Sequence, residues 1–406
     1  MANVQYYFLC FLLCLVSTFL LKSFLGKPTK SHLSLPPSPL ALPLIGHLHL
    51  LASYLPVSLH NLSTQYDPLF YLRLGASQRI VVSSVSVATE IFKTQDLTFS
   101  NHPELGFTDE MPYAKYGFFS APYDDYWRFV KKLCMTELLS SRQFERSRGV
   151  REEELIWFLR SVLECVEKKE AIDVGAELMK FSNNTLCRMA MSTRCSEKGD
   201  EAEGIRELVK DIFDVGSKMY LGDVLGPLRK LASWLYRKKA IDVFVRFDRL
   251  LERMLKDHED EGKKGEHEDL MDILLKMTKT HLKALAGDLF IGGTGTASEA
   301  ILWTIAELIN HPNAFNKLRE EIKSIFGNNR LVEESDISNL PCLQAVRTTV
   351  VMVQCFDWKF GGDGEAKVNM KVEKGAFLHM AHPLVCLPVV HFNPFASYSF
   401  DIIHYY

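Results

Sequence analysis

The chain opens with one long uncharged, apolar run. Residues 6–21 (YYFLCFLLCLVSTFLL) carry no charge, and with the two residues before them they reach the span of about 17 to 20 residues that a membrane-crossing helix needs. Basic residues follow the run, at Lys22, Lys27 and Lys30, but none precedes it, and no small-residue cleavage site comes after it. We expect residues 1–30 to be an uncleaved anchor with the body of the protein in the cytosol. A cleaved signal peptide is the alternative.

Prolines dominate the segment that follows. The sequence reads LPPSP from Leu35 to Pro39 and continues to Pro43, Gly46 and His47. Proline fixes φ and has no backbone donor, which disfavours a helix or a central strand. We therefore expect residues 31–50 to be a stiff, extended hinge.

Short strand-like runs come next, and helical repeats follow them. Residues 69–74 and 80–83 predict a small hairpin with residues 75–78 as its loop. From Ser86 to about residue 272, apolar side chains recur at helical spacing. The clearest repeats are residues 150–166, 202–219 and 240–254. The polar run 256–269 (KDHEDEGKKGEHED) interrupts them, and we expect it to be a solvated surface loop.

Two further helices are predicted beyond this loop. A long one runs from about Thr280 to Asn310, where His311 and Pro312 form a stop signal, and an amphipathic one covers residues 313–326. With one small hairpin among so many helices, the predicted fold class is mainly α with a minor β part.

Composition narrows the function classes. The 406 residues are 47% hydrophobic and 24% charged, and the net charge is −3, which gives no basic surface for a nucleic acid. Nine cysteines are scattered without a CxxC pair or metal-finger spacing, so we predict no metal site from them. Such a pattern in a long chain predicts reduced, buried thiols in a reducing compartment.

The long predicted helix carries an unusual glycine cluster. Gly292, Gly293 and Gly295 fall within four residues, and each glycine costs a helix about 1 kcal/mol relative to alanine. One explanation is a distorted turn that lets a ligand approach the backbone, with hydroxyls supplied by Thr294 and Thr296. The other explanation is a close helix crossing packed on glycine.

A second candidate site lies on a shorter helix. Trp127 and Lys131 are four residues apart and therefore share one helix face. An indole N–H and an ammonium on one face could both donate to a pair of carboxylates. A buried tryptophan beside a surface lysine is the alternative.

Three segments in this order resemble plant microsomal cytochromes P-450. They are the proline hinge, the stretch Tyr126–Lys132 (YWRFVKK) and the stretch Asp288–Ala297 (DLFIGGTGTA). The resemblance implies a cytochrome P-450-like helical body over residues 51–346. It also implies a haem cofactor, electrons from NADPH through a reductase, and a location in the endoplasmic reticulum membrane. The expected activity is insertion of one oxygen atom of O₂ into a small lipophilic plant secondary metabolite.

The resemblance also assigns site residues. It makes Thr296 the threonine that steers protons to oxygen, with Thr294 beside it, and places Gly292 and Gly293 next to the cofactor. It assigns Trp127, Arg128 and Lys131 to the haem propionates. The stretch 112–121 is expected to line substrate space, although an aromatic surface loop would have the same sequence.

The chain departs from the family pattern in the long helix. Gly295 stands where the family has an acid, and a glycine can neither hold nor pass a proton. Glu299, one turn further on, is a possible substitute, although a charged helix face is the favoured interpretation of it.

The larger departure lies after residue 346. The family's haem-ligating pattern F-x-x-G-x-x-x-C-x-G, its P-E-R-F-like segment and its E-x-x-R helix are all missing there. Residues Gln344–Arg347 (QAVR) stand where the E-x-x-R pattern is expected, and they lack its glutamate. A haem-thiolate enzyme needs the cysteine because its thiolate drives O–O cleavage.

Family-like sequence resumes near the end, at residues 354–359 and 381–388. We therefore expect the fold to be incomplete on its carboxyl-terminal side, with residues 347–406 a remnant joined after a missing segment. Cys355 and Cys386 are expected to be inert core thiols. The expected function is that of an inactive, internally shortened monooxygenase that binds haem poorly. A non-catalytic, membrane-bound binding or scaffold protein is the alternative.

Overall fold

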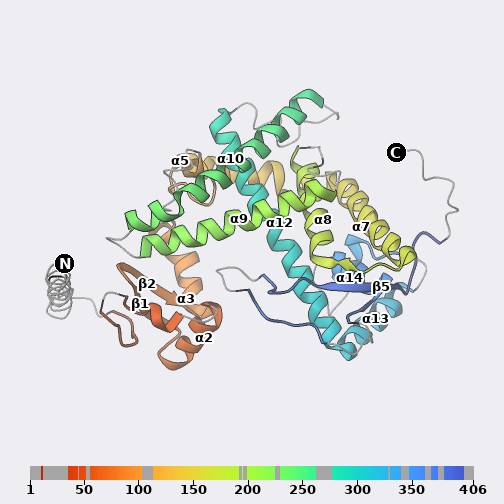
Figure 1. Cartoon of the computed structure of the whole chain (residues 1–406), viewed down its shortest axis with the longest axis horizontal. Coiled ribbons are helices and arrows are strands. Elements are labelled where there is room, and N and C mark those ends of the chain that lie inside the picture. Colours follow the sequence, from red (N-terminus) through yellow and green to blue (C-terminus); the bar gives the residue numbers. More distant parts are fainter. Residues whose placement is uncertain are drawn as a thin grey trace, which may run out of the picture. The chain divides into compact units, whose positions relative to one another are not determined.

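The computed structural model divides the chain into two compact units, each considered by itself (Figure 1). One unit contains Met1–Pro112, Ile212–Phe244 and Lys374–Phe377, and the other contains Tyr113–Asp211, Val245–Glu373 and Leu378–Tyr406. The structure describes residues 11, 35–43, 45–51, 55–102, 113–191, 194, 199–224, 229–261, 277–327, 330–339, 347–361, 367–373 and 379–396. Most of these residues are helical and a few form short strands, so the predicted fold class, mainly α with a minor β part, is confirmed.

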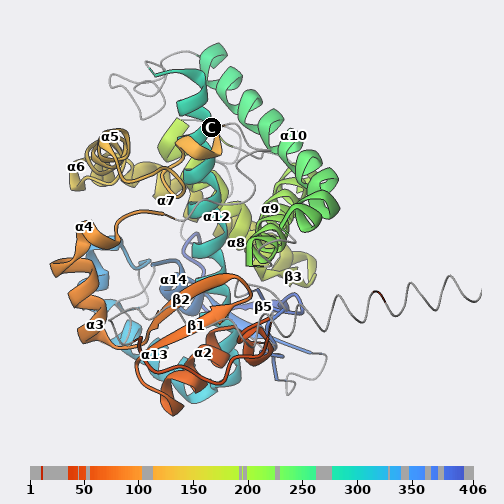
Figure 2. The ribbon, with the colours of Figure 1, turned by 90° about the vertical axis from the view of Figure 1, so that its left-hand side faces the viewer.

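The predicted hairpin is present in the first unit. Strand β1 (Leu69–Leu74) pairs antiparallel with β2 (Ser77–Val82), in a register that joins Leu69 to Val82 (Figure 2). The loop is two residues long rather than the four predicted. Gly75 adopts a φ of 57°, and such a positive value permits the tighter turn.

The predicted hinge is bound to this hairpin, most closely at Gly46 and His47. Gly46 has a φ of 62°, and a Cβ there would lie 2.0 Å from the carbonyl oxygen of Arg73, so only glycine fits. His47 is buried; its Nδ1 accepts the amide of Arg73 at 2.7 Å, while its Nε2 lies 2.9 Å from the carbonyl of Pro39. The prediction of an extended hinge is wrong in its second half, because Leu42 and Gly46 form an antiparallel bridge across a turn and the chain continues into a short 3₁₀ helix, η1 (Leu48–Leu51).

A small core stabilises the first unit. Leu62 of α2 (Leu55–Gln65) packs with Phe70 and Leu72 of β1, all three of them buried. The remaining short helices of this part of the chain are α3 (Val85–Thr89), the π-helical turn η2 (Glu90–Thr94) and α4 (Asp96–Phe99).

The second unit holds most of the helices. Its amino-terminal elements are η3 (Ala114–Tyr116), α5 (Asp125–Leu133), the π-helical turn η4 (Cys134–Leu138), α6 (Ser141–Arg146), α7 (Arg148–Lys168) and α8 (Val174–Met191). Its later elements are α12 (Lys279–Asn310), α13 (Pro312–Phe326), η6 (Glu334–Asn339) and α14 (Arg347–Cys355). Helices α9 (Gly199–Val224) and α10 (Arg229–Glu261) each contribute residues to both units.

The helical predictions are confirmed with one correction. Observed helices cover all five predicted ones, and the N-cap of α12 is Thr278, close to the predicted start. The loop predicted from residue 256 is wrong at its beginning, because α10 continues to Glu261. Lys256 and Asp257 are exposed, and an exposed helix end accommodates charges of both signs. The rest of that run lies outside the described residues.

The carboxyl-terminal segment is built into the second unit. Strands β3 (Ile172–Asp173), β5 (Val385–Val390) and β4 (Phe356–Lys359) form an antiparallel sheet in that order. Every residue of α14 is buried, and its apolar side chains join a core made with α7, α8, α12 and α13. The predicted boundaries at residues 30, 50 and 346 stay predictions.

The predicted anchor lies outside the described residues apart from Phe11. Within the described ranges no helix is both long and apolar enough to cross a membrane.

The expectation that the thiols are reduced is wrong at Cys187, which is disulfide-bonded. The other described cysteines, which are free, are Cys134, Cys165, Cys355 and Cys386.

Candidate functional site

Helix α12 carries most of the predicted site, and the glycine cluster reflects close packing. A Cβ on Gly293 would lie 2.8 Å from a methyl group of Leu186 on α8, closer than side-chain atoms approach. A Cβ on Gly292 would lie 3.1 Å from the ring of Phe119. The helix is continuous over this stretch, so the expected distorted turn is wrong and the glycine-packed helix crossing is confirmed at Gly293.

The two threonines occupy different environments. Thr294 is fully buried, and its hydroxyl donates to the carbonyl of Phe290 at 2.7 Å. Thr296 is exposed, and its hydroxyl donates to the carbonyl of Gly292 at 2.8 Å. Because Thr296 also lies one turn from Gly292, it shares an open helix face with Phe119. Of the two candidates, Thr296 is therefore the one that a substrate could reach.

Glu299 has a partner that the sequence did not predict. Its Oε1 lies 2.8 Å from Nδ1 of His379, and only about a fifth of the Glu299 side chain, 22%, is exposed. Its Oε2 is buried with no hydrogen-bond partner. The sequence favoured a charged helix face for Glu299, and the structure places this carboxylate, mostly buried, against His379. Glu299, one turn from Thr296, is thus a mostly buried carboxylate whose Oε2 accepts no hydrogen bond from the described residues.

The face of α5 that was assigned to the haem propionates is already engaged. Asp124 caps this helix by accepting the amide of Trp127 at 2.9 Å. Lys131 places its ammonium 5.1 Å from the indole centre, which confirms the shared face. The indole N–H donates to the carbonyl of Phe118 at 2.9 Å, and Arg128 pairs with Asp125. The role of these side chains toward a haem stays a prediction.

An acid on α12 completes this region. Asp288 accepts the amide of Phe119 at 3.3 Å. Burial raises the pKa of Asp288 to about 7, against the opposing effect of hydrogen bonds from the amides of Phe119 and Phe118. Such a perturbed acid next to a candidate substrate face marks a functional-site candidate.

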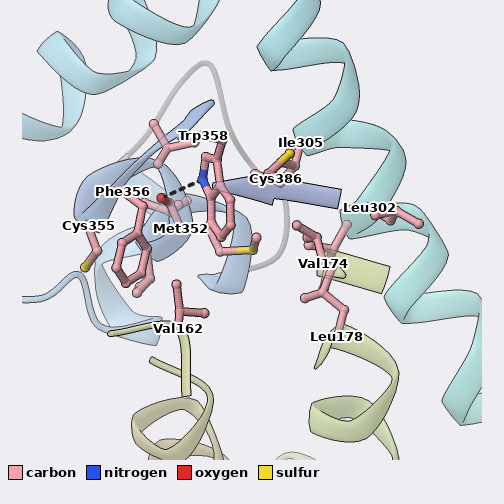
Figure 3. Packing of buried hydrophobic residues seen from close by; sticks show 14 of the residues in the cluster. Val162, Val174, Leu178, Leu302, Ile305, Met352, Cys355, Phe356, Trp358 and Cys386 are labelled. Carbon is pink, nitrogen blue, oxygen red and sulfur yellow. Dashed lines mark hydrogen bonds between the residues drawn. The ribbon is translucent and has the colours of Figure 1, made fainter. Parts of the chain in front are cut away.

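The described thiols do not fit the role of a haem ligand. Cys355 and Cys386 are almost completely buried among Val162, Phe356 and Trp358 and other apolar side chains (Figure 3). Burial raises the pKa of each thiol to about 12, so neither is a thiolate at neutral pH. Burial also raises the pKa of Cys134, to about 11, and that of Cys165. Neither Cys355 nor Cys386 is thus a candidate for an axial thiolate ligand.

The family assignment follows from comparison with known proteins. The sequence profile of the family described as Cytochrome P-450 matches residues 36–347, more than half of the chain. The chain belongs to the cytochrome P-450 family. That family implies haem, electrons from a reductase and monooxygenase chemistry.

Individual relatives are plant cytochromes P-450. Cytochrome P-450 705A22 of Arabidopsis thaliana is 40% identical over 351 residues, which cover 83% of this chain and 68% of that protein. The 3,9-dihydroxypterocarpan 6A-monooxygenase of Glycine max is 30% identical over 504 residues, which cover 95% of this chain and 99% of that protein. Because this chain has 406 residues, at least 98 of those 504 positions (504 minus 406) belong to the relative alone.

A solved structure shares the fold. The zebra fish cytochrome P-450 determined with progesterone superimposes with a TM-score of 0.58 at 24% identity, covering 73% of this chain and 70% of that one. The cytochrome P-450-like body predicted from the sequence is thereby confirmed at the level of the fold.

Sequence reasoning missed two residues of this region. Asp288 stands at the start of the stretch that carried the resemblance, and an acid in an otherwise apolar helix segment (ALAGDLFIGG) was the available signal. His379 lies in a segment without periodicity, and nothing in the sequence links it to Glu299.

Proposed function

We propose that the gene encoding this chain specifies a monooxygenase that inserts one oxygen atom of O₂ into a small lipophilic plant secondary metabolite. The family assignment supports the reaction class, and the named activity of the Glycine max relative supports the substrate class. Phe119, Gly292 and Thr296 form the substrate-facing surface in this proposal. Reducing equivalents come from NADPH through a reductase partner.

We further propose that this chain, as it stands, does not carry out that reaction. The observation behind this is the burial of Cys355 and Cys386, whose thiols have pKa values of about 12. Two facts support an internal omission near Val346: the family match ends at residue 347, and the long alignment leaves at least 98 positions of the relative unmatched. An iron atom would therefore find no thiolate donor at Cys355 or Cys386.

An absorbance spectrum tests the second proposal. The purified chain is supplied with haem, reduced and exposed to carbon monoxide, and we expect no thiolate-type Soret band. A chain with the omitted segment restored from genomic sequence is the matched positive control, and it should give that band. A thiolate-type band from the short chain that disappears in C355S or C386S contradicts the proposal. Reading transcripts across codons 346 and 347 decides whether a longer product exists.

A second candidate function is a haem-independent binding or scaffold protein. One observation favours it: buried side chains of α14, β4 and β5 pack into the hydrophobic core of this unit. Purification of a folded, cooperatively unfolding chain free of haem supports this candidate. Aggregation of the haem-free chain under conditions in which the restored chain folds argues against it.

A membrane-bound location is also part of the proposal. It rests on the apolar run 6–21, which is long enough to anchor the chain in the endoplasmic reticulum membrane. The lysines that follow this run are expected to keep the body of the protein on the cytosolic side. In microsomes, the chain should resist extraction with alkaline carbonate and remain sensitive to added protease. A chain lacking residues 1–30 is the control and should be extracted.

A further inference from the structure

The aromatic segment from Tyr116 to Ala121 is clamped between two helices. From α5, the hydroxyl of Tyr126 donates to the carbonyl of Tyr116 at 3.0 Å, and the indole of Trp127 donates to the carbonyl of Phe118 at 2.9 Å. From α12, Asp288 accepts the amide of Phe119 at 3.3 Å. One helix thus binds the segment's carbonyls, and the other binds its amides.

Gly117 gives the carboxylate of Asp288 the room that it needs. A Cβ on Gly117 would lie 2.6 Å from Oδ2 and 3.0 Å from Oδ1 of Asp288. Because real Cβ atoms do not approach so closely, any larger residue would push the carboxylate off the segment. The glycine and the aspartate therefore work as a pair.

The clamp determines where two phenylalanine rings lie. Phe118 stacks on Trp127 with ring centres 5.2 Å apart and an interplanar angle of 18°. The edge of Phe119 rests on Gly292, yet 54% of this residue stays exposed, on the helix face that also carries Thr296. Moving the Phe118 and Phe119 backbone would move the apolar wall beside Thr296.

We propose that Asp288 is a positioning residue that holds Phe118 and Phe119 in place and so sets the shape of the lipophilic substrate surface beside Thr296. This inference rests on the proposed function only in calling that surface substrate-binding. The proposed role needs the side-chain oxygen of Asp288 as a hydrogen-bond acceptor and does not need its negative charge, because an uncharged carboxyl or amide oxygen also accepts a hydrogen bond from an N–H.

Among the described residues, the charge of Asp288 acts on the phenol of Tyr126 and on the thiol of Cys134. It contributes to raising the pKa of each group, and burial is the larger cause for both. The imidazole of His281 contacts the rings of Tyr116 and Tyr126.

Amide hydrogen exchange of the chain without haem tests the clamp directly. The variants are D288N, which keeps an acceptor, D288L, which removes it, and G117A, which displaces it. We expect D288L and G117A to speed exchange at the Phe118 and Phe119 amides about tenfold, as loss of one hydrogen bond implies, and D288N to stay within about threefold. The controls are D248N, in an ion pair with Lys283, and G204A, whose Cβ would meet nothing within 4 Å.

A lipophilic probe tests the consequence for binding. With 8-anilinonaphthalene-1-sulfonate, D288L and G117A should change the dissociation constant at least threefold, and D288N should restore it to the wild-type value. Unchanged exchange in both D288L and G117A, or loss of the clamp in D288N equal to that in D288L, overturns the proposal. If D288L does not fold, G117A and D288N decide the question. Exchange needs neither haem nor turnover, so a negative result here is distinct from failure of the proposed monooxygenase.

Discussion

Arg347 donates a fork of hydrogen bonds to Glu152, a residue 195 positions earlier in the chain. Its Nη2 lies 2.8 Å from Oε1 of Glu152, and its Nε donates to the carbonyl of Val332 at 2.8 Å. The sequence has Gln344 where the family's helix has an acid, so no acid stands three residues before Arg347. In the structure α7 supplies the acid, and this ties α14 to the rest of the core.

Removal of the Glu152 charge should therefore destabilise the second unit. The Arg347 side chain is only 8% exposed, and E152Q removes the acid that pairs with it, although Glu334 and Asp336 still interact with its charge. We therefore expect a loss of about 1 to 3 kcal/mol in the free energy of unfolding. Urea denaturation measures it. The control is E333Q, because the Arg148–Glu333 pair is exposed and should contribute less than about 1 kcal/mol. Equal effects of E152Q and E333Q would contradict this account.

The buried thiols should resist alkylation. With pKa values of about 12 and almost no exposed surface, Cys355 and Cys386 should remain unmodified by iodoacetamide at pH 8 in the folded chain. In urea both should react fully, as mass spectrometry of peptides would show. Cys165, which is partly exposed, is the internal comparison and should react first. Rapid modification of Cys355 under native conditions would show that the core around α14 is open.

Alanine at two glycines should have opposite effects. G293A places a Cβ 2.8 Å from Leu186, and we expect overpacking to cost about 1 to 3 kcal/mol of stability. G204A lies in the interior of α9 with nothing within 4 Å, and the better helix propensity of alanine should stabilise the chain by about 1 kcal/mol. Thermal or urea unfolding compares the two. A neutral G293A would mean that α8 and α12 separate readily.

The stability of the chain should depend on Asp288 through pH. Burial raises its pKa from 3.8 to about 7, so the folded state binds its proton more tightly than the unfolded state. The contribution of this group is complete below about pH 4 and is lost as pH rises to about 7, at up to about 1.4 kcal/mol per pH unit.

The difference between wild type and D288N isolates that contribution. Relative to D288N, the wild type should lose unfolding free energy between pH 4 and pH 7 and change little above pH 8. Acids with lowered pKa values, such as Glu334 beside Arg151, titrate in the opposite sense in both proteins and cancel in the comparison. A constant difference across this range would show that Asp288 is ionised and hydrated in the folded chain.

The roles predicted for the site residues stay predictions, but the structure shows contacts that the sequence did not predict. Thr296 is exposed, whereas Thr294 is fully buried. Trp127 and Lys131 share a face, as their spacing required, yet the indole N–H is bound to Phe118. The spacing of residues along a helix predicts which side chains share a helix face. It does not predict which other segment of the chain packs against that face.

Local signals in the sequence were enough for five of the helices, the hairpin and the family. Periodicity located α7, α12 and α13, and Gly75 and Gly46 mark turns that need a positive φ. The fold alone decided that Asp288 meets Phe119, that Glu299 meets His379 and that Arg347 meets Glu152. Helix and strand patterns arise from neighbours a few residues apart, whereas these pairs are separated by 80 to 195 residues and meet only when the core has packed.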